Sequence, residues 1–111
     1  MRSKLLIVIK VILMFVVLIL TLPYIKAEYL TSKYGKEFIG LEQQTQMLNS
    51  AKYHKVVSYS KNEATVFYVT NNSGNVIIFK RNENEEWILK FWNVVWSKTG
   101  SADNFSWPYY R

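Results

Sequence analysis

The sequence predicts an α+β protein attached to a membrane, on three observations. A near-continuous apolar stretch runs from Leu5 to Ile25, apolar residues then recur at helical spacing over residues 28–49, and from residue 55 onward the hydrophobic period changes to two. We therefore expect an N-terminal transmembrane helix, then an amphipathic helix packed on a four-stranded antiparallel meander. The part beyond the apolar stretch, residues 28–111, has the length of one domain.

The apolar stretch is long enough to cross a bilayer. At 1.5 Å per residue, its helix would be about 32 Å long, close to the thickness of the hydrocarbon core. Lys10 costs about 2.5–3.5 kcal/mol on the insertion scale, which the surrounding apolar residues outweigh, and its long stem can reach the headgroups. The positive-inside rule predicts a cytoplasmic N-terminus from Arg2, Lys4 and Lys10. Tyr24 and Lys26 are then expected at the outer interface of the membrane.

A cleaved secretory signal is the alternative interpretation of the same stretch. Residues 2–10 would form the charged region and residues 11–20 the apolar region, with Pro23 breaking the helix ahead of a cut after Ala27. Ile25 lies two residues before Ala27 and is not small, which disfavours this site. We expect an uncleaved anchor, while a chain cut after Ala27 would be secreted. A buried core helix is disfavoured because the stretch is apolar on all sides.

The basic charge of the chain is mostly a signal of topology. Residues 1–27 carry four basic side chains and no acidic one, whereas residues 28–111 carry ten basic and eight acidic ones. The near balance of the second part argues against nucleic acid as a partner. The chain has no cysteine, so neither a disulfide framework nor a lipoprotein-type anchor is expected. Its stability must come from the burial of apolar side chains, sixteen of them aromatic in residues 28–111.

The predicted helix over residues 28–49 contains two glycines. Gly35 and Gly40 each weaken a helix by about 1 kcal/mol relative to alanine, so a kink or a close contact is expected. The helix could continue from the apolar stretch with a bend at Pro23. The apolar positions of its inner face are Leu30, Tyr34, Phe38, Leu41 and Leu48.

The second half of the chain predicts four short strands joined by polar turns. We expect turns at residues 71–75 and 82–86, and strands at about residues 55–60, 64–70, 76–81 and 87–97. One helix followed by four antiparallel strands resembles the cystatin-like arrangement, in which a helix lies across a curled sheet. That resemblance concerns architecture and carries no inhibitory activity with it.

At the level of the whole chain, the sequence resembles small uncharacterised membrane-anchored or secreted proteins of Bacillus-type Gram-positive bacteria. The resemblance rests on the short charged start, the single apolar span, the Tyr- and Lys-rich helix and the β-rich end. It has no specific motif and implies an extracytoplasmic location without an activity.

The strand predicted over residues 87–97 is apolar on both faces. Strict alternation places Trp87, Leu89, Phe91 and Val95 on one face and Ile88, Trp92, Val94 and Trp96 on the other. We expect the aromatic C-terminal tail, residues 105–111, to fold back over Trp92 and Trp96. The alternative is an exposed aromatic surface able to bind wall glycan or a peptide, formed by Trp92, Trp96, Trp107 and Tyr109.

The polar residues show no catalytic or metal-binding pattern. His54 is the only histidine, and we expect it to be exposed and structural, with no metal or cofactor bound. Asp103 is expected to form a turn through its side chain, and the acidic turn is expected to be solvated, with Glu83, Glu85 and Glu86 as its carboxylates.

The sequence therefore predicts a non-enzymatic accessory domain outside the cytoplasm that interacts with an envelope protein or peptide. Two alternatives remain open. One is a glycan- or peptide-binding module that uses the exposed tryptophans. The other is a small hydrolase acting through Asp103 or the glutamates, since a pair of catalytic carboxylates is defined in space and not in sequence.

Overall fold

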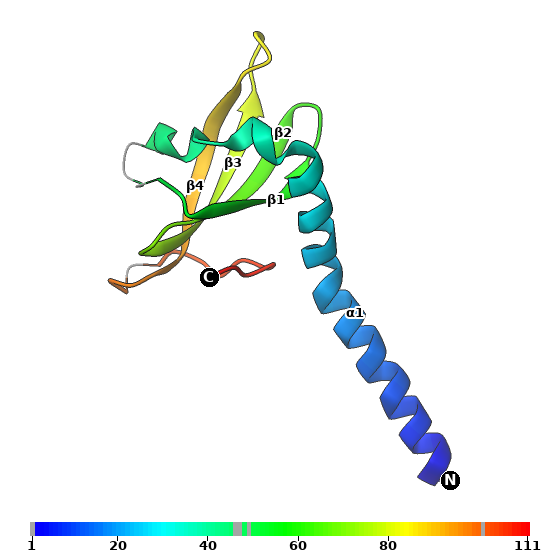
Figure 1. The fold of residues 1–111 in the computed structure, drawn as a ribbon. Coiled ribbons are helices and arrows are strands. Elements are labelled where there is room, and N and C mark those ends of the chain that lie inside the picture. Colours follow the sequence, from blue (N-terminus) through cyan, green and yellow to red (C-terminus); the bar gives the residue numbers. More distant parts are fainter. Residues whose placement is uncertain (1, 46–47, 49, 101) are drawn as a thin grey trace.

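A computed structural model describes residues 2–45, 48, 50–100 and 102–111 of the chain. A single long helix is followed by two short 3₁₀ helices and four strands (Figure 1). The elements are α1 (Arg2–Tyr34), η1 (Gly35–Phe38), η2 (Leu41–Thr45), β1 (Tyr53–Tyr59), β2 (Glu63–Val69), β3 (Ser73–Arg81) and β4 (Trp87–Ser97). The strands pair in the order β1-β2-β3-β4, each antiparallel to the next. This arrangement confirms the predicted α+β fold with a meander, while the cystatin-like label stays a prediction.

Helix α1 has a free half and a packed half. Its first half projects away from the sheet (Figure 1), and the side chains of residues 5–20 are exposed there. Within the described residues, this is the one helix long and apolar enough to cross a membrane. The helix passes through Pro23 without a break, so the predicted apolar and amphipathic helices are one element.

The helix predicted over residues 28–49 is wrong beyond Tyr34, where α1 ends. The carbonyl of Gly35 bonds to Nε2 of His54 at 2.7 Å, so this carbonyl has a partner outside the helix. Gly40 adopts a positive φ of 81°, which turns the chain between η1 and η2. The chain can therefore wrap around the sheet instead of extending past it. Residues 46, 47 and 49 of the predicted helix lie outside the described part.

The strand prediction is correct for 87–97 and for the end of β3 at Arg81, and the other strand ends shift by one to three residues. The largest shift concerns the turn expected at residues 71–75, because Ser73, Gly74 and Asn75 belong to β3. Gly74 lies directly under the indole of Trp96, and a Cβ at this position would be 2.1 Å from Nε1 of that ring. This glycine is needed for a close side-chain approach, and not for a turn.

Both faces of the sheet carry a hydrophobic core. On one face, the helix-side core is covered by Leu30 of α1 and Phe38 of η1. Its strand residues are Val56, Ala64, Val66, Tyr68, Ile77, Phe79 and Trp87. On the other face, the tail-side core is covered by Tyr109 and Tyr110, and its strand residues are Phe67, Val69, Val76 and Val95.

The strict alternation expected along residues 87–97 is wrong because β4 contains two irregularities. Its register against β3 shifts between Ile78 and Phe79, which pair with Phe91 and Leu89, and again near Gly74. Each extra residue on β4 reverses which face the following side chains occupy. Trp92 therefore joins the helix-side core while Trp96 packs on the tail side.

The β1 edge of the sheet is covered by α1. The backbone N–H of Val56 donates to Oγ1 of Thr31 at 2.8 Å, and Lys55 forms an ion pair with Glu28 at 2.7 Å. The hydroxyl of Thr31 thereby supplies an acceptor to an N–H group of the edge strand.

The β4 edge is covered at two places by side chains. Gln44 accepts from the N–H of Leu89 at 2.8 Å and donates to the carbonyl of Trp87 at 3.0 Å. Asp103 accepts from the N–H of Val94 at 3.0 Å through its carboxylate, and its own N–H donates to the Val94 carbonyl at 2.8 Å. Each side chain occupies the edge as a neighbouring strand would.

Candidate functional site

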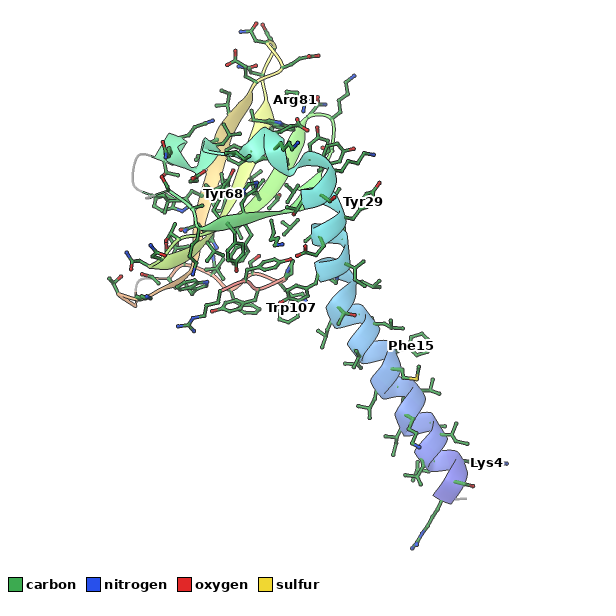
Figure 2. All side chains as sticks on the ribbon, in the orientation of Figure 1. Lys4, Phe15, Tyr29, Tyr68, Arg81 and Trp107 are labelled. Carbon is green, nitrogen blue, oxygen red and sulfur yellow. The ribbon has the colours of Figure 1, made fainter. Side chains whose placement is uncertain are left out.

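The C-terminal tail, residues 105–111, lies under the tail side of the sheet and contacts α1 (Figure 2). Nε1 of Trp107 donates to the carbonyl of Leu20 at 3.0 Å. The hydroxyl of Tyr24 donates to the carbonyl of Tyr109 at 2.8 Å and accepts from its N–H at 2.9 Å. One hydroxyl therefore satisfies both backbone groups of a tail residue, and fixes the tail to the helix.

Aromatic rings pack between α1 and the C-terminal tail. The ring of Tyr24 packs edge-on against Trp107 and Tyr110, with centroid distances of 5.2 and 5.3 Å. Trp96 donates from Nε1 to the Tyr110 carbonyl at 2.7 Å. Burial raises the pKa of Tyr110 to about 12, with a further contribution from the charge of Glu28. The Tyr110 hydroxyl is buried and has no hydrogen-bond partner among the described residues.

A groove of about 690 Å³ opens where α1, the sheet and the tail meet, and we call it the junction groove. Its polar lining residues are Lys26, Ser58, Thr65 and Ser106. Its apolar walls are Ile19, Leu22, Pro23, Val57, Trp107 and Pro108. A groove of this size can hold a ligand as large as many cofactors.

A charged cluster holds the end of α1 and η1 against the sheet. Arg81 donates to Glu37 at 3.2 Å and to the hydroxyl of Tyr59 at 3.0 Å, and its guanidinium lies 4.1 Å from the ring centre of Trp87. Trp87 in turn donates from Nε1 to Glu37 at 3.2 Å. The ring of Tyr59 stacks on that of Tyr34 with centroids 3.7 Å apart. Burial raises the pKa of the Tyr59 hydroxyl.

A second groove of about 450 Å³ lies beside this cluster, and we call it the acidic groove. It lies at the end of the sheet that carries the β3–β4 hairpin, away from the tail (Figure 1). Ile88 is 45% exposed there. The lining residues are Glu37, Leu41, Gln44, Glu85, Glu86, Trp87 and Ile88. The groove combines carboxylates with apolar surface.

The residues of the predicted aromatic surface are divided between the two sides of the sheet. Trp92 lies on the helix side and donates from Nε1 to Oδ1 of Asn75 at 3.0 Å. Trp96 and Tyr109 lie on the tail side, and Trp107 lies at the junction with 46% of its surface exposed. The tail covers Trp96 as expected, but it does not cover Trp92.

The predicted topology residues have two kinds of environment. Arg2, Lys4 and Lys10 are exposed on the free half of α1, where Figure 2 shows Lys4 near the far end. Tyr24 is turned toward the tail instead of toward open surroundings, and Lys26 lines the junction groove.

Two polar residues differ from their predicted surroundings. His54 is half-buried and not exposed, because its ring stacks on Tyr68 with centroids 5.4 Å apart while Nε2 contacts Gly35. The side chain of Asp103 accepts a hydrogen bond from the N–H of Val94 in β4, nine residues away. Sequence spacing gives no sign of either contact, since the partners are up to nineteen residues away.

The carboxylates considered for hydrolysis do not come together as one set. Asp103 is bound to the β4 backbone, whereas Glu85 and Glu86 line the acidic groove and Glu83 is exposed nearby. In the part of the chain that the structure describes, no three His, Asp or Glu side chains gather as a metal site would require. The hydrolase alternative stays a prediction.

The residues that organise the acidic groove have no counterpart among the residues predicted from the sequence. Glu37, Tyr59 and Arg81 form one cluster although up to 44 residues separate them, and Gln44 reaches β4 over 45 residues. Single residues of these types occur on every protein surface. No motif marks them, and only the tertiary fold brings them together.

Comparisons with known proteins add no relative to this description. No protein-family model, no curated protein and no solved structure matches the chain. The two grooves and the apolar helix are therefore the features that bear on function.

Proposed function

We propose that this chain is a single-span membrane protein that keeps its N-terminal helix, with the N-terminus in the cytoplasm and the sheet domain outside. The observation that carries the proposal is the contact between α1 and the domain. Ala27 is 0% exposed, and the Tyr24 hydroxyl holds both backbone groups of Tyr109. The C-terminal half of α1, which continues directly from the apolar stretch, is thus part of the packed domain.

Cleavage after Ala27 would remove these contacts. The product would lose the Tyr24 clamp, the partner of Trp107 at Leu20, and the buried methyl group of Ala27. The Tyr109 backbone groups would then need water or another partner, since unpaired buried polar groups cost about 1–3 kcal/mol each. Retention of the helix leaves all of them satisfied.

The test is the N-terminus of the mature protein together with its fractionation. We expect a chain that starts before the apolar stretch and resists extraction from membranes at alkaline pH. Protease added outside intact cells should degrade the sheet domain, and protease added to inverted vesicles should not. A soluble chain that starts at Glu28 would contradict the proposal.

We assign the domain a non-enzymatic accessory role, in which the acidic groove binds a basic and partly apolar segment of another envelope protein. The support is the pairing of Glu85 and Glu86 with the apolar surface of Trp87 and Ile88. The groove lies at the end of the domain away from the tail and the membrane-side junction (Figure 1), where a neighbouring protein can reach it.

Photocrosslinking from position 88 tests this role in membranes of the source cell. We expect one discrete adduct from the full-length protein, which weakens when Glu85→Gln and Glu86→Gln are combined. Glu83→Gln is the matched control, because this residue lies in the same hairpin but does not line the groove. Absence of an adduct, or equal loss with Glu83→Gln, would contradict the assignment.

A further inference from the structure

The junction groove lies at a defined height along α1. Leu20 is five residues before Ile25, the end of the apolar stretch, which corresponds to about 7.5 Å along the helix. Because Trp107 bonds to the Leu20 carbonyl at 3.0 Å, its indole lies beside the apolar part of the helix. A helix that spans the bilayer with residues 5–25 therefore brings Trp107 down to the edge of the hydrocarbon layer.

The groove changes from apolar to polar along the same direction. Ile19 and Leu22 line its lower part, and Lys26 lies at its upper end. From Ile19 to Lys26 the helix rises about 10 Å. This order matches that of a phospholipid, whose acyl chains lie below and whose phosphate lies above, at the level where lysine and tryptophan side chains are favoured.

Charge supports the same occupant. Lys26 takes part in no ion pair among residues 2–45, 48, 50–100 and 102–111, whereas its neighbour Glu28 is paired with Lys55 at 2.7 Å. Ser58, Thr65 and Ser106 also line the groove, and each carries a hydroxyl group of the kind that donates to phosphate oxygens. The groove therefore combines one cation and three hydroxyl-bearing residues with apolar walls.

We infer that the junction groove binds an anionic phospholipid of the outer leaflet, with its phosphate at Lys26 and its acyl chains against Ile19, Leu22 and Trp107. This inference rests on the proposed membrane anchoring. The lipid completes the contact between the tail and the helix, so the domain stands in a fixed orientation on the membrane surface.

The test uses the full chain in phosphatidylcholine vesicles that contain a small fraction of brominated phosphatidylglycerol or brominated phosphatidylcholine. Bromine quenches tryptophan at short range, and subtracting the signal of Trp107→Phe isolates the contribution of Trp107. We expect an apparent affinity for brominated phosphatidylglycerol about fivefold above that for brominated phosphatidylcholine, from the attraction of one lysine to an anionic lipid.

The substitution Lys26→Gln should abolish this preference without changing quenching by phosphatidylcholine. Lys33→Gln is the matched control, since Lys33 is exposed on the same helix two turns above the groove. Equal quenching by the two lipids in the unmodified chain, or equal effects of the two substitutions, would overturn the inference. Flotation of the chain with the vesicles separates the two proposals. If the chain floats but shows no Trp107 quenching, only the lipid inference is wrong. If the chain does not float, the proposed anchor is wrong as well.

Discussion

The hydroxyl of Tyr24 should control how firmly the tail is held against α1. Tyr24→Phe keeps the ring contacts with Trp107 and Tyr110 and removes only the oxygen that bonds to Tyr109 at 2.8 and 2.9 Å. Both backbone groups of Tyr109 then lose their partner at a part-buried position. Leaving such a group unsatisfied costs about 1–3 kcal/mol.

This cost predicts a local change that can be measured by hydrogen exchange. Counting only the N–H group, whose exchange is measured, a loss of about 1–3 kcal/mol from the free energy of tail opening corresponds to roughly 5- to 150-fold faster exchange of the Tyr109 amide. The exchange is followed by mass spectrometry on the full chain in lipid nanodiscs, with peptides that cover residues 102–111. The amides of β2 and β3 should be unaffected, because their ladder does not involve the tail.

Tyr29→Phe is the control for the loss of a phenol on the same helix. Tyr29 is 61% exposed, and Figure 2 shows it on the side of α1 that faces away from the sheet. It should leave exchange in the tail unchanged. If Tyr24→Phe also leaves the Tyr109 amide as protected as before, the Tyr24 hydroxyl does not hold the tail and the packed junction argued above is wrong.

Three further predictions concern stability, measured by urea unfolding of the full chain in detergent micelles. Gly74→Ala should destabilise the domain by about 1–3 kcal/mol, because the added Cβ would meet the indole of Trp96. In a Trp96→Ala background the same change should be neutral or stabilising. Equal effects in both backgrounds would refute the contact. Gln44→Ala should cost about 0.5–1.5 kcal/mol and expose the Leu89 amide to exchange. Gln43→Ala, whose side chain makes an exposed hydrogen bond to Ser50, should cost less than half of that. The contribution of Tyr110 to stability should be constant up to about pH 10 and be lost between pH 10 and 12, because the unfolded chain releases the Tyr110 proton near its ordinary pKa of 10.0 while burial raises the folded pKa to about 12. Tyr110→Phe should therefore reduce the fall in stability over this range without lowering stability at pH 7. An unchanged pH profile would show that the hydroxyl is solvated.

The elements that could be predicted from the sequence are those with a strong local pattern. The apolar stretch and the alternation of residues 87–97 lie in continuous segments, so the helix and β4 were located correctly. The end of α1 at Tyr34 could not be predicted, since it depends on the contact of Gly35 with His54. A local pattern holds no information about a partner nineteen residues away.

The candidate site could be predicted only in part, for a similar reason. The tail was expected to cover a face of the sheet, and it does cover Trp96. The separation of Trp92 from Trp96 arises from irregular pairing in β4, which lies opposite Gly74 in the neighbouring strand. Lys26 was assigned to the interface from its position alone, whereas the groove beside it needs the strands and the tail to be in place.

If the proposed membrane anchoring holds, the covered edges of the sheet have a consequence for copies of this protein in one membrane. A membrane confines its proteins to two dimensions and brings their domains to the same height, so open strand edges would meet often and could join into growing ladders. Here a second copy would have to displace Thr31 on one edge, or Gln44 and Asp103 on the other, before its backbone could pair. On the proposed anchoring, crowding on the membrane should therefore leave the domains separate, because strand addition at either edge would first have to break these side-chain hydrogen bonds.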